Sequence, residues 1–261
     1  MSIDNNAEVT RRDALTSLAL GGAAFLASCT STASLAAEPS RPAPGAPAAG
    51  AAPPAFAGAH GVTPLPFAPG SLQGISEKLI TSHHDNNYAG AVKNLNKVEQ
   101  ELAQVTADTP AFLVAALRER ELTFRNSKSL HEAYFANLGG DGKRSGAIDG
   151  ALATAYGSAA IWEQHMHATA AGLGGGSGWA ILALELDTGA LRTFGSGNHT
   201  QTLATSLPLL VLDMYEHSYQ MDYGAAAARY IDAFFTNVKW EEVNRRFELG
   251  GRASTLLRTP A

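Results

Sequence analysis

Two long segments with helical periodicity, separated by a short polar connection, are the feature that most constrains the fold of this chain. Apolar residues recur at spacings of three and four over residues 75–105 and over residues 109–138, which predicts two helices. Pro110 stands in the first turn of the second segment, where a missing N–H is tolerated. Because the connection is short, the two helices should form an antiparallel hairpin.

The pattern changes after the hairpin. One helix is predicted over residues 148–172, and two apolar runs flanking an Asp-Thr-Gly turn predict a β-hairpin. The fully apolar run at residues 207–213 suits a central strand, and two closing helices are predicted over residues 224–240 and 241–249. We therefore expect an α+β fold with a three-stranded antiparallel sheet.

These patterns divide the chain into four parts. An export signal is expected at residues 1–37 and a disordered linker rich in Pro, Ala and Gly at residues 38–61, because that tract holds too few large apolar residues to offset the entropy of ordering. The helical hairpin domain is expected at residues 62–141 and the α/β domain at residues 142–261.

The N-terminal segment has the layout of an export signal. Arg11 and Arg12 precede an apolar stretch, residues 15–27, which is too short to span a bilayer core of about 30 Å. The arginine pair resembles a twin-arginine signal, and an ordinary secretory signal is the alternative. We expect a periplasmic or extracellular protein.

Cys29, the single cysteine, lies in Leu-Ala-Ser-Cys, which resembles a lipobox whose cysteine is acylated. The alternative is that Cys29 leaves with a peptide cleaved after Ala36 or Ala37. Membrane association is therefore expected only through a lipid anchor or an uncleaved signal. Beyond residue 60 the chain carries 16 basic and 20 acidic residues, and without a basic footprint nucleic-acid binding is not expected.

A candidate metal site follows from the segment Leu-Asp-Met-Tyr-Glu-His-Ser-Tyr at residues 212–219. A strand that ends in Asp213, with His217 just beyond it, brings a carboxylate and an imidazole to one end of a sheet. This combination of oxygen and nitrogen ligands suits iron, manganese or zinc. His83 and His131 lie on the two hairpin helices and can face each other if these are antiparallel.

Several motifs, in this order, resemble the iron/manganese superoxide dismutase family from residue 61 to residue 249. They are Leu-Pro-Phe-Ala-Pro-Gly-Ser-Leu at 65–72, His-His-Asp-Asn-Asn-Tyr at 83–88, His-Glu-Ala-Tyr-Phe at 131–135, Gly-Ser-Gly-Trp-Ala at 176–180, the segment at 212–219, and the run at 237–247. The resemblance implies four metal ligands, with water or hydroxide as a fifth: His83, His131, Asp213 and His217. One iron or manganese ion per subunit is implied.

The resemblance also implies residues around the metal. His199 falls where the family has a residue that hydrogen-bonds the bound solvent, Trp179 matches an aromatic that lines the pocket, and Tyr215 stands where the family has a tryptophan. Glu216 matches an acid that reaches the ligand histidine of the other subunit, which implies a homodimer or a higher homo-oligomer.

The substrate gate departs from the family pattern. The family commonly has a histidine four residues and a tyrosine eight residues after the first ligand, and here these positions are Asn87 and Ala91. Gln220 replaces a second tyrosine, so that Asn87 and Gln220 could form an amide pair, and Tyr88 offers a displaced phenol.

The expected activity is dismutation of superoxide to oxygen and hydrogen peroxide by an exported antioxidant enzyme. Two alternatives remain open at this point. One is a metal-binding relative with weak or no dismutation because of the altered gate. The other is a non-haem iron oxygenase, which uses fewer protein ligands and leaves open positions.

Overall fold

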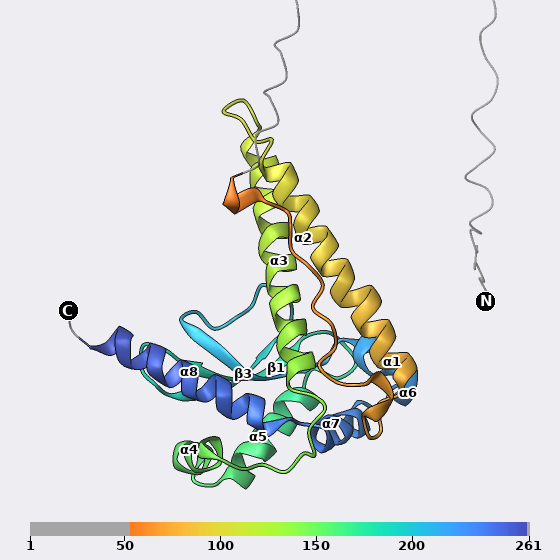
Figure 1. Ribbon diagram of the computed structural model, residues 1–261, viewed down its shortest axis with the longest axis vertical. Coiled ribbons are helices and arrows are strands. Elements are labelled where there is room, and N and C mark those ends of the chain that lie inside the picture. Colours follow the sequence, from red (N-terminus) through yellow and green to blue (C-terminus); the bar gives the residue numbers. More distant parts are fainter. Residues whose placement is uncertain (1–52, 260–261) are drawn as a thin grey trace, which may run out of the picture. The chain divides into compact units, whose positions relative to one another are not determined.

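A helical hairpin forms the first part of the structure, a computed structural model that describes residues 53–259. It consists of α1 (Glu77–Ser82), a π-helical turn (His83–Tyr88) and α2 (Ala89–Leu102), with α3 (Ala111–Ala136) returning alongside (Figure 1). The buried side chains of α2 follow the predicted helical spacing, as at Val92, Leu95 and Leu102. The π-helical turn is the one irregularity in this helix, and such turns often mark functional sites.

The second part contains helices on a small antiparallel sheet. The strands are β1 (Trp179–Glu185), β2 (Leu191–Ser196) and β3 (Ser206–Asp213), in the order β2-β1-β3. The helices are α4 (Ala147–Tyr156), α5 (Ala159–Ala171), α6 (Gln220–Tyr223), α7 (Ala227–Thr236) and α8 (Trp240–Arg258). The predicted α+β fold, a helical hairpin followed by a three-stranded antiparallel sheet, is confirmed.

The prediction of a central strand at residues 207–213 was wrong, because β1 lies in the middle of the sheet and β3 at its edge. Helices α3 and α8 pack against β3, so an edge strand can be as apolar as a central one. The buried side chain of Asn137 hydrogen-bonds two backbone groups on the open edge of β3. Its amide donates to the Leu209 carbonyl at 3.0 Å, and its oxygen accepts from the Val211 N–H at 3.0 Å.

The single helix predicted over residues 148–172 is in fact two helices, α4 and α5. Gly157 adopts a φ of 84° at the break, a left-handed conformation that favours glycine. Ser158 then caps α5 by accepting a hydrogen bond from the Ile161 N–H. A Gly-Ser pair inside a helical pattern was the signal for this break.

Residues 53–61 depart from the predicted linker because they lie against the helical hairpin. The Gly58 N–H and the His60 ring both hydrogen-bond the carboxylate of Glu99, at 2.9 and 2.8 Å, and the Arg125 guanidinium pairs with the same group. The Glu99 side chain is only 2% exposed, and a buried carboxylate needs such partners. We call residues 53–61 the strap. The ordered part of the chain therefore begins earlier than the composition of this tract predicts.

Acid should release this strap. Burial raises the pKa of Glu99, but hydrogen bonds from His60 and Gly58 outweigh burial and lower it below its usual value. The stabilisation is thus present above the unfolded pKa of about 4.3 and is lost as pH falls through the lower folded pKa. The protection factor of the Gly58 N–H, which compares its exchange rate with the intrinsic rate at the same pH, should therefore fall on acidification.

A Glu99→Gln variant should show the loosened strap already at pH 7, with a loss of about 1–3 kcal/mol in local stability. Glu101→Gln, two residues along and exposed, is the matched control and should exchange like the wild type. Equal Gly58 exchange in the Glu99→Gln and wild-type proteins at pH 7 would contradict this account of the strap.

The predicted export signal and Cys29 lie outside the described residues, as does the first part of the predicted linker. Within residues 53–259, no helix combines the length and apolar character needed to cross a membrane.

Candidate metal centre

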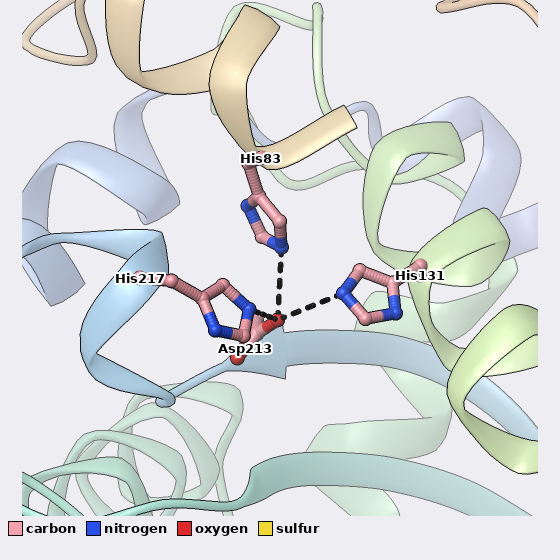
Figure 2. Close-up of side chains that lie close together, drawn as sticks. All are labelled: His83, His131, Asp213 and His217. Carbon is pink, nitrogen blue, oxygen red and sulfur yellow. Dashed lines mark hydrogen bonds and ion pairs between the residues drawn. The ribbon is translucent and has the colours of Figure 1, made fainter. Parts of the chain in front are cut away.

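Four side chains from four elements converge at the junction between the hairpin and the sheet. His83 comes from the π-helical turn, His131 from α3, Asp213 from the last residue of β3, and His217 from the short helical turn Glu216–Ser218 (Figure 2). Their potential ligand atoms all lie within 4.8 Å of one another. The structure thus brings together the four residues that the sequence singled out as ligands.

The geometry centres on one carboxylate oxygen. The Nε2 atoms of His83, His217 and His131 lie 3.1, 3.3 and 3.7 Å from Oδ2 of Asp213. Of these nitrogens, those of His131 and His217 are buried without a hydrogen-bond partner. Buried polar atoms normally have partners, so the orphaned nitrogens that point at a common centre fit a metal ion.

Protonation states also suit a metal. Burial lowers the pKa of His131 to about 3 and, against its hydrogen bond with Asp213, lowers the pKa of His83. Burial alone would raise the pKa of Asp213, but the neighbouring His217 and His83 side chains hold that pKa well below its usual value. The buried histidines are therefore neutral and the acid is ionised near neutral pH, the forms that ligate a metal.

The His131 ring is oriented by its own helix. Its Nδ1 donates to the carbonyl of Ser127, one turn earlier, at 2.7 Å. This bond fixes the proton on Nδ1 and leaves Nε2 free as a ligand. The sequence analysis did not identify Ser127, although the carbonyl four residues before any helical histidine is a candidate acceptor.

His199, Trp179 and Tyr215 form a cluster beside these four residues. The Trp179 indole donates to Nδ1 of His199 at 3.0 Å, and the Tyr215 ring stacks on His199 with ring centroids 4.8 Å apart. Because an indole N–H can only donate, Nδ1 must accept, and the proton of a neutral His199 resides on Nε2. Burial lowers the pKa of His199, which favours this neutral form.

The three altered gate residues differ in burial and do not form the expected amide pair. Ala91 is buried, Asn87 is half-buried and Gln220 is exposed, and among the described residues no hydrogen bond joins the two amides. The Tyr88 hydroxyl donates to Glu132 at 2.7 Å and accepts from the Thr63 N–H at 2.8 Å. The Tyr88 phenol is therefore engaged between the backbone at Thr63 and the Glu132 side chain on α3.

Glu216 is exposed in the single chain, and the neighbouring His217 side chain is 27% exposed. The other three residues of the cluster are almost completely buried, with side-chain exposures of 0 to 2%. The His217 side is therefore the open face of the site.

Three imidazoles and one carboxylate form a group that can hold one metal ion, and this combination of nitrogen and oxygen ligands suits iron, manganese or zinc. Comparison with known proteins identifies its family. Residues 144–246 match the C-terminal domain of iron/manganese superoxide dismutases. The chain is 46% identical over 185 residues to the iron superoxide dismutase of Cupriavidus metallidurans, covering 70% of this chain and 94% of that protein.

Two further relatives carry different metals in their names. The manganese superoxide dismutase 1 of Halobacterium salinarum is 35% identical over 191 residues, covering 71% of this chain and 93% of that protein. The iron superoxide dismutase of Aquifex aeolicus is 35% identical over 211 residues, covering 77% of this chain and 98% of that protein. This chain belongs to the iron/manganese superoxide dismutase family.

Proposed function

We propose that the protein dismutates superoxide with one iron or manganese ion held by His83, His131, Asp213 and His217. The observation that carries this proposal is the convergence of three imidazole nitrogens on one buried carboxylate oxygen. A bound ion would supply one-electron chemistry, taking an electron from one superoxide and giving an electron to another. Two superoxide ions and two protons then yield one oxygen and one hydrogen peroxide.

The protein's own side chains set the net charge of the ligand set and supply protons. Neutral imidazoles and a single carboxylate keep the net ligand charge low, so that both oxidation states of the ion stay accessible. The Nε2–H of His199, fixed by the Trp179 indole, can donate to a solvent molecule in the site and relay protons toward the forming peroxide. Four protein ligands, rather than three with open positions, argue against the oxygenase alternative.

A dismutation assay on iron-loaded and manganese-loaded protein tests the proposal. The rate per bound ion should exceed that of the free ion by orders of magnitude. A fully loaded protein with no activity above the free ion would instead support the weak-turnover relative that Asn87 and Ala91 suggest.

We propose further that the protein works as a homodimer in which Glu216 contacts His217 of the partner subunit. The support is the open His217 face and the exposed acid beside it. A partner carboxylate there would orient the ring and raise its basicity.

Glu216→Ala should lower metal affinity or activity by about 10- to 100-fold, a typical loss for such partners. Light scattering should also show weaker dimerisation. Glu248→Ala, an exposed acid on α8, is the control and should leave both unchanged. A monomeric wild type with full metal occupancy would overturn the proposal.

Export is the last part of the proposal, and it rests on the arginine pair, the apolar stretch and Cys29. Residues 1–37 fused to a reporter should direct it across the bacterial inner membrane. Replacing Arg11 and Arg12 by lysine should block transport if the signal is of the twin-arginine type. Retention of the unaltered fusion in the cytoplasm would contradict export.

A further inference from the structure

Asn126 makes a contact that reaches from the ligand-bearing helix to the loop of His199. Its side-chain amide donates to the backbone carbonyl of His199 at 2.7 Å. Asn126 lies on α3, five residues before His131, and His199 lies in the loop between β2 and β3. The bond therefore joins two elements that each contribute a group to the metal centre.

Two neighbouring residues of α3, Ser127 and Asn126, make hydrogen bonds that position two different histidines. The Ser127 carbonyl accepts from the His131 ring, whereas the neighbouring Asn126 side chain fixes the His199 backbone. The two rings lie 6.3 Å apart, centroid to centroid. A displacement of the His199 loop from α3 would thus change the spacing between the proton-donating imidazole and a metal ligand.

The remaining hydrogen bonds of the loop do not join it to α3: the Trp179 indole, at the start of β1, holds the His199 ring, and the others fix only the loop backbone and its polar side chains. Ser196 Oγ donates to the Asn198 carbonyl, Thr200 donates to the Asn198 side chain, and Ser177 donates to the Gly197 carbonyl. These bonds are local or lead to the start of β1. Among the residues that the structure describes, Asn126 is the only α3 side chain that hydrogen-bonds the loop.

We propose that Asn126 is a positioning residue for the reaction, acting through His199 by fixing that imidazole at a set distance from His131. This inference rests on the proposed function, in which the Nε2–H of His199 donates to solvent in the metal site. Such a donor tunes the balance between the oxidised and reduced ion. Loss of the Asn126 bond should shift that balance even when the metal remains fully bound.

A redox titration of iron-loaded protein provides the test, with the ratio of reduced to oxidised iron at one applied potential as the readout. Asn126→Leu keeps the approximate volume and removes the donor, and it should change this ratio by about 3- to 10-fold. Asn126→Gln keeps an amide donor and should recover part of the change. Thr200→Val, which removes a bond within the loop only, is the matched control and should not alter the ratio.

A double-mutant cycle with His199→Ala separates the possible outcomes. Once the imidazole is absent, Asn126→Leu should have no further effect on the ratio. An undiminished effect in that background, or no effect of Asn126→Leu where His199→Ala has one, would overturn the positioning role. A His199→Ala protein with the wild-type ratio would overturn the role of His199 itself, and this inference with it.

Discussion

Asp213→Asn should abolish useful metal binding while leaving the fold in place. The substitution keeps the size of the side chain but replaces an ionised oxygen, on which three imidazole nitrogens converge, by a neutral amide. Partners outside the ligand set are worth about 10- to 100-fold in affinity or activity, so loss of the only anionic ligand should cost at least ~100-fold. Metal content after dialysis measures this directly.

Thermal stability offers a second measure of the same change. At free metal 1,000 times its dissociation constant, binding stabilises the wild type by about 4 kcal/mol, and a 100-fold weaker site gains only about 1.4 kcal/mol under the same conditions. Asp232→Asn is the matched control, since Asp232 is exposed and lies 3.9 Å from His167 at the surface. An Asp213→Asn protein with wild-type metal content and the wild-type metal-induced shift in stability would refute the assigned site.

The convergence of the four ligands could be anticipated because each occupies a regular position in its element. Asp213 ends an apolar strand, and His83 and His131 lie on helices whose short connection makes them antiparallel. These are local patterns, and the order of the motifs adds the long-range pairing that periodicity alone lacks. Ligand positions therefore follow from sequence far better than their surroundings do.

The surroundings depend on contacts that leave little local trace. The apolar run at residues 207–213 is compatible with a central strand and with an edge strand covered by helices, because helices and neighbouring strands bury the same side chains. Only the pairing of Asn137 with the β3 backbone shows how the edge is closed. Likewise, nothing near Asn126 in the sequence points to the carbonyl of His199, 73 residues away.

The positions of Tyr88 and Ala91 also could not be predicted from local sequence. A π-helical turn from His83 to Tyr88 changes the angle between successive residues, so spacing counted on an α-helix does not place the side chains that follow the first ligand. Tyr88 meets the Thr63 backbone and the Glu132 side chain on α3, and both are contacts over 25 or more residues that helical spacing does not show. A gate residue cannot be assigned from such spacing alone.

Gly178→Ala should destabilise the protein strongly, because this glycine allows the backbone before β1 to approach the end of β2 closely, beside the metal centre. Gly178 has a φ of 139°, and a Cβ at this position would lie 2.3 Å from the backbone oxygen of Ser196. Strained backbone costs about 1–3 kcal/mol and overpacking typically another 1–3 kcal/mol. We therefore expect a loss of about 2–6 kcal/mol in the free energy of unfolding, measured by denaturant titration.

The damage should extend to the site, since the Gly178 carbonyl accepts from the Met214 N–H and the next residue, Trp179, pairs with Asp213 across the sheet. Gly150→Ala is the matched control: an added Cβ there meets no atom within 4 Å in α4, and helix propensity should stabilise that variant by up to about 1 kcal/mol. Opposite signs for the two substitutions would show that the close approach at Gly178 decides the effect. Equal stability in both variants would mean that the backbone at Ser196 can move away from Gly178 without cost, and this account of Gly178 would then be wrong.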